Sequence, residues 1–136
     1  MDEMPRNFRT ARSLRVLLAP ADRALAVLLG MEPDIDVVAQ VRAGDDLAAA
    51  AIMCRPEVAL VDEVSAVSAV LAEVPECRVL VLATSAHPGL AGRALAAGAA
   101  GLVLRDGPVP DLAEAVRRAS MGETVVDPAL ADPAGA

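Results

Sequence analysis

Runs of consecutive apolar residues constrain the fold of this sequence more than any other feature. Four of them, each four residues long, lie at 16–19, 58–61, 79–82 and 101–104, and residues 35–41 also have the composition of a strand. Half-exposed strands alternate apolar and polar residues, whereas unbroken apolar runs are typical of parallel strands covered on both faces. The sequence therefore predicts five buried parallel strands.

The segments between these runs have the spacing of helices. Asp22 is placed to cap a helix whose apolar face carries Leu25, Leu28 and Leu29. Pro110 suits the first turn of a last helix, where no backbone N–H donor is needed. Strand and helix thus alternate five times, which predicts an α/β sandwich of three layers. The other helices are expected from Gly44 or Asp45 to Cys54, over 64–73 and over 88–97, and the last helix should turn Leu112, Ala115, Val116 and Ala119 towards the sheet.

Length and charge limit what the chain can do. Its 136 residues, of which 55% are hydrophobic, suffice for one domain with a substantial core. We expect a flexible N-terminal tail over 1–13, a folded domain over 14–123 and a C-terminal linker or tail over 124–136. The formal net charge of −7 argues against binding of nucleic acid by this chain itself.

The absence of targeting and cross-linking features predicts a cytoplasmic protein. No apolar stretch approaches the ~18 residues that cross a bilayer, so no membrane association is expected. Cys54 and Cys77 form neither a disulfide framework nor a zinc site, and we interpret both as small buried hydrophobic residues.

Asp62 is the main candidate functional residue, because it ends a buried strand with a carboxylate. Functional groups of open α/β sheets gather outside the carboxyl ends of the strands. The same edge should hold Ala19–Pro20, Ala83–Thr84 and Arg105–Asp106. His87, the one histidine, is interpreted as a surface loop residue, and the sequence has no nucleophile–histidine arrangement and no phosphate-binding glycine motif. We therefore do not expect an enzyme.

Several motifs stand out when they are taken together in their order and spacing. They are RVLLA at 15–19, EPDIDVV at 32–38, RPEVALVD at 55–62, RVLVL at 78–82, AGAAGLVLRD at 97–106 and MGETVVDPA at 121–129. This set resembles a response-regulator receiver domain of the NarL/FixJ type, and the resemblance covers about 14–127. It implies a flavodoxin-like, doubly wound sheet with the strand order 2-1-3-4-5 and a role in two-component signal transduction and transcription regulation.

The resemblance matches Asp62 to the aspartate that accepts a phosphoryl group in receivers. The two acids that hold Mg²⁺ in the family correspond here to Pro20 and Ala21, which offer no ligand to a cation that prefers oxygen donors. Asp22 follows them directly, but helix capping is its expected role. We therefore expect no metal and no other cofactor, and an Asp62 that does not work as a phosphoacceptor.

The positions that correspond to the family's switch residues also depart from the pattern. The Thr or Ser after the fourth strand corresponds to Ala83, and Thr84 comes one residue later, on the other face. The lysine corresponds to Arg105, which keeps the charge but not the compact ammonium group, and the aromatic residue of the fifth strand corresponds to Leu102. We expect Arg105 to form a partly buried ion pair with Asp62, whose loss would cost more than the loss of an exposed pair.

Two interpretations of function stay open. In the first, the chain is an atypical receiver that acts by protein contact, as the N-terminal part of a helix-turn-helix transcription factor or as a stand-alone module. Its partner would be a second copy, with a sensor kinase as a further candidate, and Glu114, Arg117 and Arg118 would pair across a two-fold axis. In the second, it is a pseudo-receiver that senses a small molecule in a pocket at the carboxyl ends of the strands.

Overall fold

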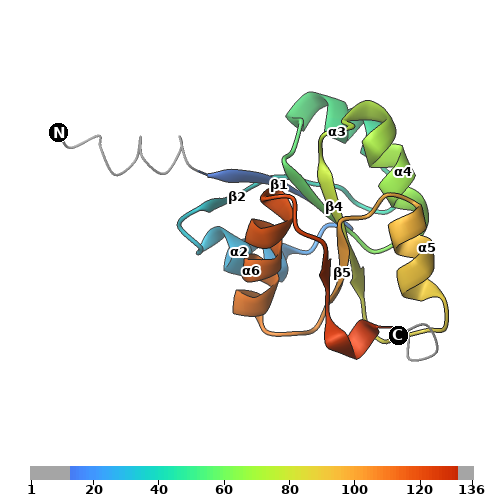
Figure 1. Ribbon diagram of the computed structural model, residues 1–136. Helices are drawn as coiled ribbons and strands as arrows, with labels where there is room; N and C mark the ends of the chain where they lie inside the picture. The colour runs from blue at the N-terminus through green and yellow to red at the C-terminus, as the bar shows by residue number, and fades with distance from the viewer. Residues whose placement is uncertain (1–12, 132–136) are drawn as a thin grey trace.

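The computed structural model of the protein describes residues 13–131, which form one parallel sheet with helices on both faces (Figure 1). The strand order is β2-β1-β3-β4-β5-β6, which confirms the predicted order of the first five strands. The strands are β1 (Leu14–Ala19), β2 (Ile35–Gln40), β3 (Val58–Val61), β4 (Arg78–Ala83), β5 (Gly101–Leu104) and β6 (Val125–Val126), and the helices are α2 (Arg23–Gly30), α3 (Leu47–Cys54), α4 (Val64–Glu73), α5 (Leu90–Ala96), α6 (Val109–Ser120) and a short 3₁₀ helix, η1 (Pro128–Leu130).

The unbroken apolar runs supply two cores, one on each face of the sheet. Successive residues of a strand point to opposite faces. Val16 and Leu18 of β1 accordingly pack beneath α2 and α6, while Leu17 and Ala19 pack beneath α3, α4 and α5 (Figure 1). Because both faces are covered, neither set of strand residues can be polar, and the predicted three-layer sandwich is confirmed.

The C-terminal segment corrects the expectation of five strands and a linker from residue 124. Val125 and Val126 form β6, which pairs in parallel with Gly101 and Leu102 of β5. Leu130 in η1 is only 1% exposed and belongs to the core beneath α5. Two apolar residues between turn formers are too short a pattern to distinguish a strand from a loop, so no periodic signal marks this strand in the sequence.

The helices differ from the expected ones in small ways. Leu28 is 45% exposed, so Leu25 and Leu29 are the buried residues of α2, with Ala26 packed partly against the same core. The second helix starts after Asp46, whose carboxylate accepts a hydrogen bond from the Ala49 N–H at 3.0 Å. The helix expected over 88–97 is α5 (Leu90–Ala96). The expected N-terminal tail lies outside the described residues, apart from Ser13.

Candidate functional site

The strand register brings the predicted site residues to one edge of the sheet. Ala19 pairs with Val61, and Val61 with Val81, so β1, β3 and β4 end close together. Ala83 of β4 pairs with Leu104 of β5. Asp62 follows β3 and Arg105 follows β5, and both side chains therefore emerge at the carboxyl edge of the sheet, as predicted from the strand order.

Arg105 lies between two carboxylates at this edge. Its Nη1 is 3.8 Å from Oδ2 of Asp62, and its Nη2 is 3.9 Å from Oδ2 of Asp22. Both distances are within the range of an ion pair and beyond that of a hydrogen bond. The exposed fractions of the side chains are 31% for Arg105, 33% for Asp22 and 40% for Asp62. The expected pair is thus present but solvated, and such pairs contribute at most about 1 kcal/mol each.

The two carboxylate oxygens of Asp22 have different partners. Oδ1 accepts a hydrogen bond from the Leu25 N–H at 3.0 Å and caps α2, as the sequence predicted. Oδ2 is the atom that faces Arg105, a contact that the sequence did not predict. The preceding Pro20 and Ala21 have no side-chain oxygen. Among residues 13–131, no group of three or more Asp, Glu, His or Cys side chains is placed to hold a metal ion.

The four positions that correspond to switch residues, Ala83, Thr84, Leu102 and Arg105, differ in burial and location. Ala83 is half-buried at the end of β4, whereas Thr84 is exposed in the loop that follows. Leu102 is fully buried in the core beneath α3, α4 and α5, so it is a packing residue and does not reach the edge. Of these four positions, Ala83, Thr84 and Arg105 line a hollow beside Asp62, and Leu102 does not.

Two hollows flank Asp62. The first, of about 340 Å³, is bordered by Asp62, Thr84, Ser85, His87 and Arg105. In this hollow the Ser85 hydroxyl lies 3.4 Å from Nε2 of His87. The sequence interpretation missed both residues as site candidates, although their position just after β4 places them at the same edge. The second hollow, of about 270 Å³, lies between Pro20, Leu47 and Glu63.

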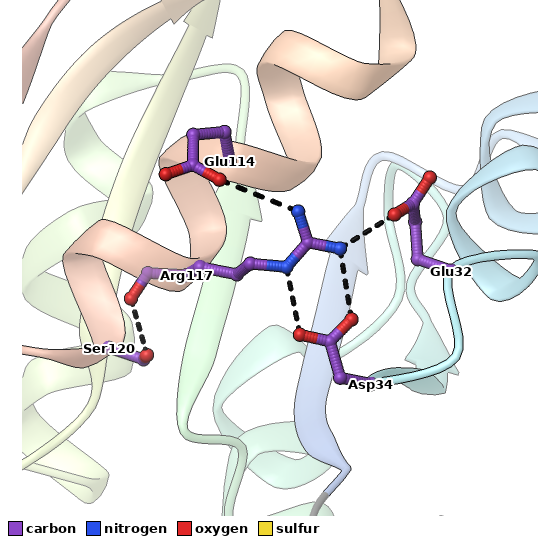
Figure 2. A network of polar contacts seen from close by, with 5 residues as sticks. All are labelled: Glu32, Asp34, Glu114, Arg117 and Ser120. Atoms are coloured by element: carbon purple, nitrogen blue, oxygen red, sulfur yellow. Dashed lines mark hydrogen bonds and ion pairs between the residues drawn. The ribbon is translucent and has the colours of Figure 1, made fainter.

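Arg117 forms a different charged cluster where α6 meets the segment before β2 (Figure 2). Its guanidinium donates to Asp34 at 2.8 Å and to Glu32 at 2.6 Å, and it lies 3.5 Å from Glu114. The hydrogen bonds to Asp34 and Glu32 raise the pKa of Arg117 above its ordinary value. The hydrogen bond from Arg117 is the main reason that the pKa of Asp34 is lowered.

This cluster weakens the expected basis for pairing through α6. Arg117 is bound to two carboxylates of its own chain, so it is not a free partner for Glu114 of a second copy. Arg118 donates to Glu123 at 2.9 Å, in a pair whose side chains are 45% and 46% exposed, so the expected pairing with Glu114 depends on Arg118 alone. The pattern of outward charges on a helix does not reveal that a distant segment supplies the counter-charges.

Comparison with known proteins gives consistent matches, although no protein-family profile matches the chain. The uncharacterized transcriptional regulatory protein YvfU of Bacillus subtilis is 35% identical over 127 residues, 88% of this chain and 62% of that protein. The transcriptional regulatory protein DesR of the same organism is 32% identical, over 79% of this chain and 56% of its own length. The response regulator protein VraR of Staphylococcus aureus is 31% identical, over 74% of this chain and 51% of its own length. The chain thus spans little more than half of these relatives.

Solved structures agree with the sequence relatives. The signal receiver domain of the putative response regulator NarL from Mycobacterium tuberculosis superposes with a TM-score of 0.69 at 26% identity, over 82% of this chain and 99% of that domain. A two-component response regulator of the LuxR family from Aurantimonas shares the fold, with a TM-score of 0.73 at 18% identity, over 90% of this chain and 91% of that one. No helix in the described part of this chain is long and apolar enough to span a membrane.

Proposed function

Because the chain belongs to the receiver domains of NarL/LuxR-family response regulators, we propose that it regulates by protein contact, without Mg²⁺-dependent phosphorylation of Asp62. A receiver domain of transcription regulators is a signalling unit, and we propose that contact with another protein produces its signal.

The position of Arg105 carries this proposal. Phosphoryl transfer requires cations that neutralise the oxygens of the transferred group, and Mg²⁺ requires oxygen ligands in a near-octahedral arrangement. Pro20 and Ala21 supply none, and the carboxylate of Asp22 is shared between a helix cap and Arg105. The residues therefore do not fit Mg²⁺. The guanidinium instead places a permanent positive charge between Asp22 and Asp62.

We propose an output through self-association and through a segment that lies beyond the described residues. The relatives are transcriptional regulators, and the chain covers only 51–62% of their lengths. This supports a role as the N-terminal part of a helix-turn-helix transcription factor, with a stand-alone module as the alternative. The docking of β6 and η1 supports a receiver unit that extends to Leu130 rather than to residue 123. A sensor kinase would then act by binding and not by transferring a phosphoryl group.

Sensing of a small molecule is the second candidate function. The two hollows beside Asp62, of about 340 and 270 Å³, favour it, because they offer charged and hydroxyl groups at the edge where α/β sheets bind ligands. A ligand bound there would contact Arg105 and replace its ion pairs with Asp22 and Asp62. This candidate is compatible with regulation by protein contact.

A titration with Mg²⁺ followed by NMR tests the proposal. The amides of Asp22, Asp62 and Arg105 should show no saturable shift in the native chain. The double variant Pro20→Asp/Ala21→Asp restores the family's acid pair and serves as the matched control, because it should gain a saturable response. Saturable shifts at the Asp62 amide of the native chain would overturn the proposal.

A further inference from the structure

Helix α3 has an unusual composition for a surface helix. Its sequence, LAAAAIMC, contains no charged residue and no hydroxyl or amide side chain. Helices that are apolar all round are normally buried. In this chain, however, only Ala51 of α3 is buried, while Ile52 is 50% exposed and Met53 is 83% exposed. Met53 has the largest exposed fraction of any large apolar side chain in the described residues.

The rest of the chain covers only one side of α3. Leu47, Ala50 and Ala51 face the core that lies beneath α3, α4 and α5. The helix packs against α4, and on its other flank lies β2, the edge strand of the sheet (Figure 1). Ala49, Ile52 and Met53 thus form an uncovered apolar face, which we call the α3 face.

Opposite charges stand at the two ends of the α3 face. Asp45 and Asp46 lie at the amino end, and neither forms an ion pair with any described residue. Arg55 follows the helix at the carboxyl end, where the guanidinium of Arg15 also donates to the carbonyl of Cys54. Arg55 pairs with Glu76 at 2.9 Å, but both side chains are more than half exposed, at 59% and 67%. Such a pair contributes little and can exchange partners.

We infer that the α3 face is the surface through which two copies of this chain pair, with the two α3 helices antiparallel about a two-fold axis. That arrangement sets Ile52 and Met53 of each copy over Ala49 of the other. It also sets Arg55 of each copy against Asp45 and Asp46 of the other. The nine-residue step from Asp46 to Arg55 spans roughly 13 Å along a helix, so both ends are matched at the same time.

The other helix faces fit a second copy less well. On α6, Arg117 is held by two carboxylates of its own chain, and only the half-exposed Arg118 could exchange its partner Glu123 for a second copy. On α2, Met31 is 73% exposed, but the adjacent Glu32 is held by Arg117 at 2.6 Å. One short helix per copy buries little area, so we expect a weak dimer with a dissociation constant on the order of micromolar.

Sedimentation equilibrium of the full chain over a micromolar concentration series tests this inference, which rests on the proposed action by protein contact. Met53→Lys should weaken the dimer at least about tenfold, since it places a charge within the apolar part of the contact. Met31→Lys is the matched control, a substitution of a methionine that is 73% exposed directly after α2, and it should leave the dimer unchanged. Circular dichroism checks that both variants fold.

A charge reversal tests the antiparallel arrangement. Arg55→Asp should weaken the dimer, and the added Asp45→Arg change in the same chain should restore it. A dimer that Met31→Lys disrupts and Met53→Lys does not would overturn the inference and leave the proposed function standing. A native chain that is monomeric at every concentration would overturn both the inference and the proposed self-association, while the Mg²⁺ titration separately decides whether the site binds Mg²⁺.

Discussion

Replacing Gly101 with alanine should displace the C-terminal strand β6. Gly101 pairs with Val125, and a Cβ atom added at Gly101 would lie 1.9 Å from the carbonyl oxygen of Val125 and 2.8 Å from its carbonyl carbon. The obstructing atoms belong to the backbone, so no change of rotamer can relieve the overlap. Strand β6 must therefore move away from β5.

The size of the effect follows from what β6 and η1 bury. Val125 is 8% exposed and Leu130 is 1% exposed. Full burial of two such side chains is worth roughly 3–6 kcal/mol, which is the upper limit for complete detachment. The backbone freedom that residues 125–130 regain offsets part of this. We expect the free energy of unfolding to fall by about 2–3 kcal/mol, a typical value for an overpacked site.

Chemical denaturation and amide hydrogen exchange measure the two parts of this prediction. The N–H of Val125 donates to Ala100 at 3.0 Å and the N–H of Asp127 donates to Leu102 at 2.9 Å, so both amides should lose protection in Gly101→Ala. Gly92→Ala in α5 is the control, because the added Cβ would meet no atom within 4 Å apart from its chain neighbours and the backbone of its own helix. It should change stability by less than about 1 kcal/mol. If Gly101→Ala keeps the native stability and full protection of both amides, β6 is not displaced and the prediction is wrong.

Three further predictions concern single side chains. Arg117→Met should lower the free energy of unfolding at neutral pH. Arg117 lowers the pKa of Asp34 in the folded state, so the difference in free energy between the variant and the native chain should shrink as the pH falls below 3.8, the ordinary pKa of Asp34. Urea melts across that pH range measure the difference. Arg105→Ala should lower the free energy of unfolding by no more than about 1 kcal/mol, since its contacts are solvated and beyond hydrogen-bond distance; a larger loss would show a buried pair. Burial raises the pKa of Cys77 to about 12, so a thiol reagent at mildly alkaline pH should modify the half-exposed Cys54 first, and equal rates would contradict this.

The fold could be read from the sequence wherever its signal was a pattern over several residues. Strand β5 (Gly101–Leu104) and helix α4 (Val64–Glu73) have the predicted bounds, because apolar runs and helical spacing report burial directly. Strand β6 escaped prediction because two residues carry no period. Its position depends on Gly101 of a strand that lies more than twenty residues earlier, and local patterns do not contain such pairings.

The sequence was sufficient to predict which residues lie at the site, but less so to predict which residues they contact. The topology rule placed Asp62 and Arg105 at one edge, and the structure brings them within 3.8 Å. The second contact of Arg105, with Asp22, was missed because the capping role alone explained that aspartate. Arg117 shows the same limit, since its partners Glu32 and Asp34 lie more than eighty residues away in the chain.

Intact-mass spectrometry after incubation with acetyl phosphate and Mg²⁺ tests the central proposal most directly. We expect the native chain to keep its mass, because Pro20 and Ala21 offer no ligand to a cation and Arg105 lies between Asp22 and Asp62. A stoichiometric gain of one phosphoryl group that disappears in Asp62→Asn would contradict it.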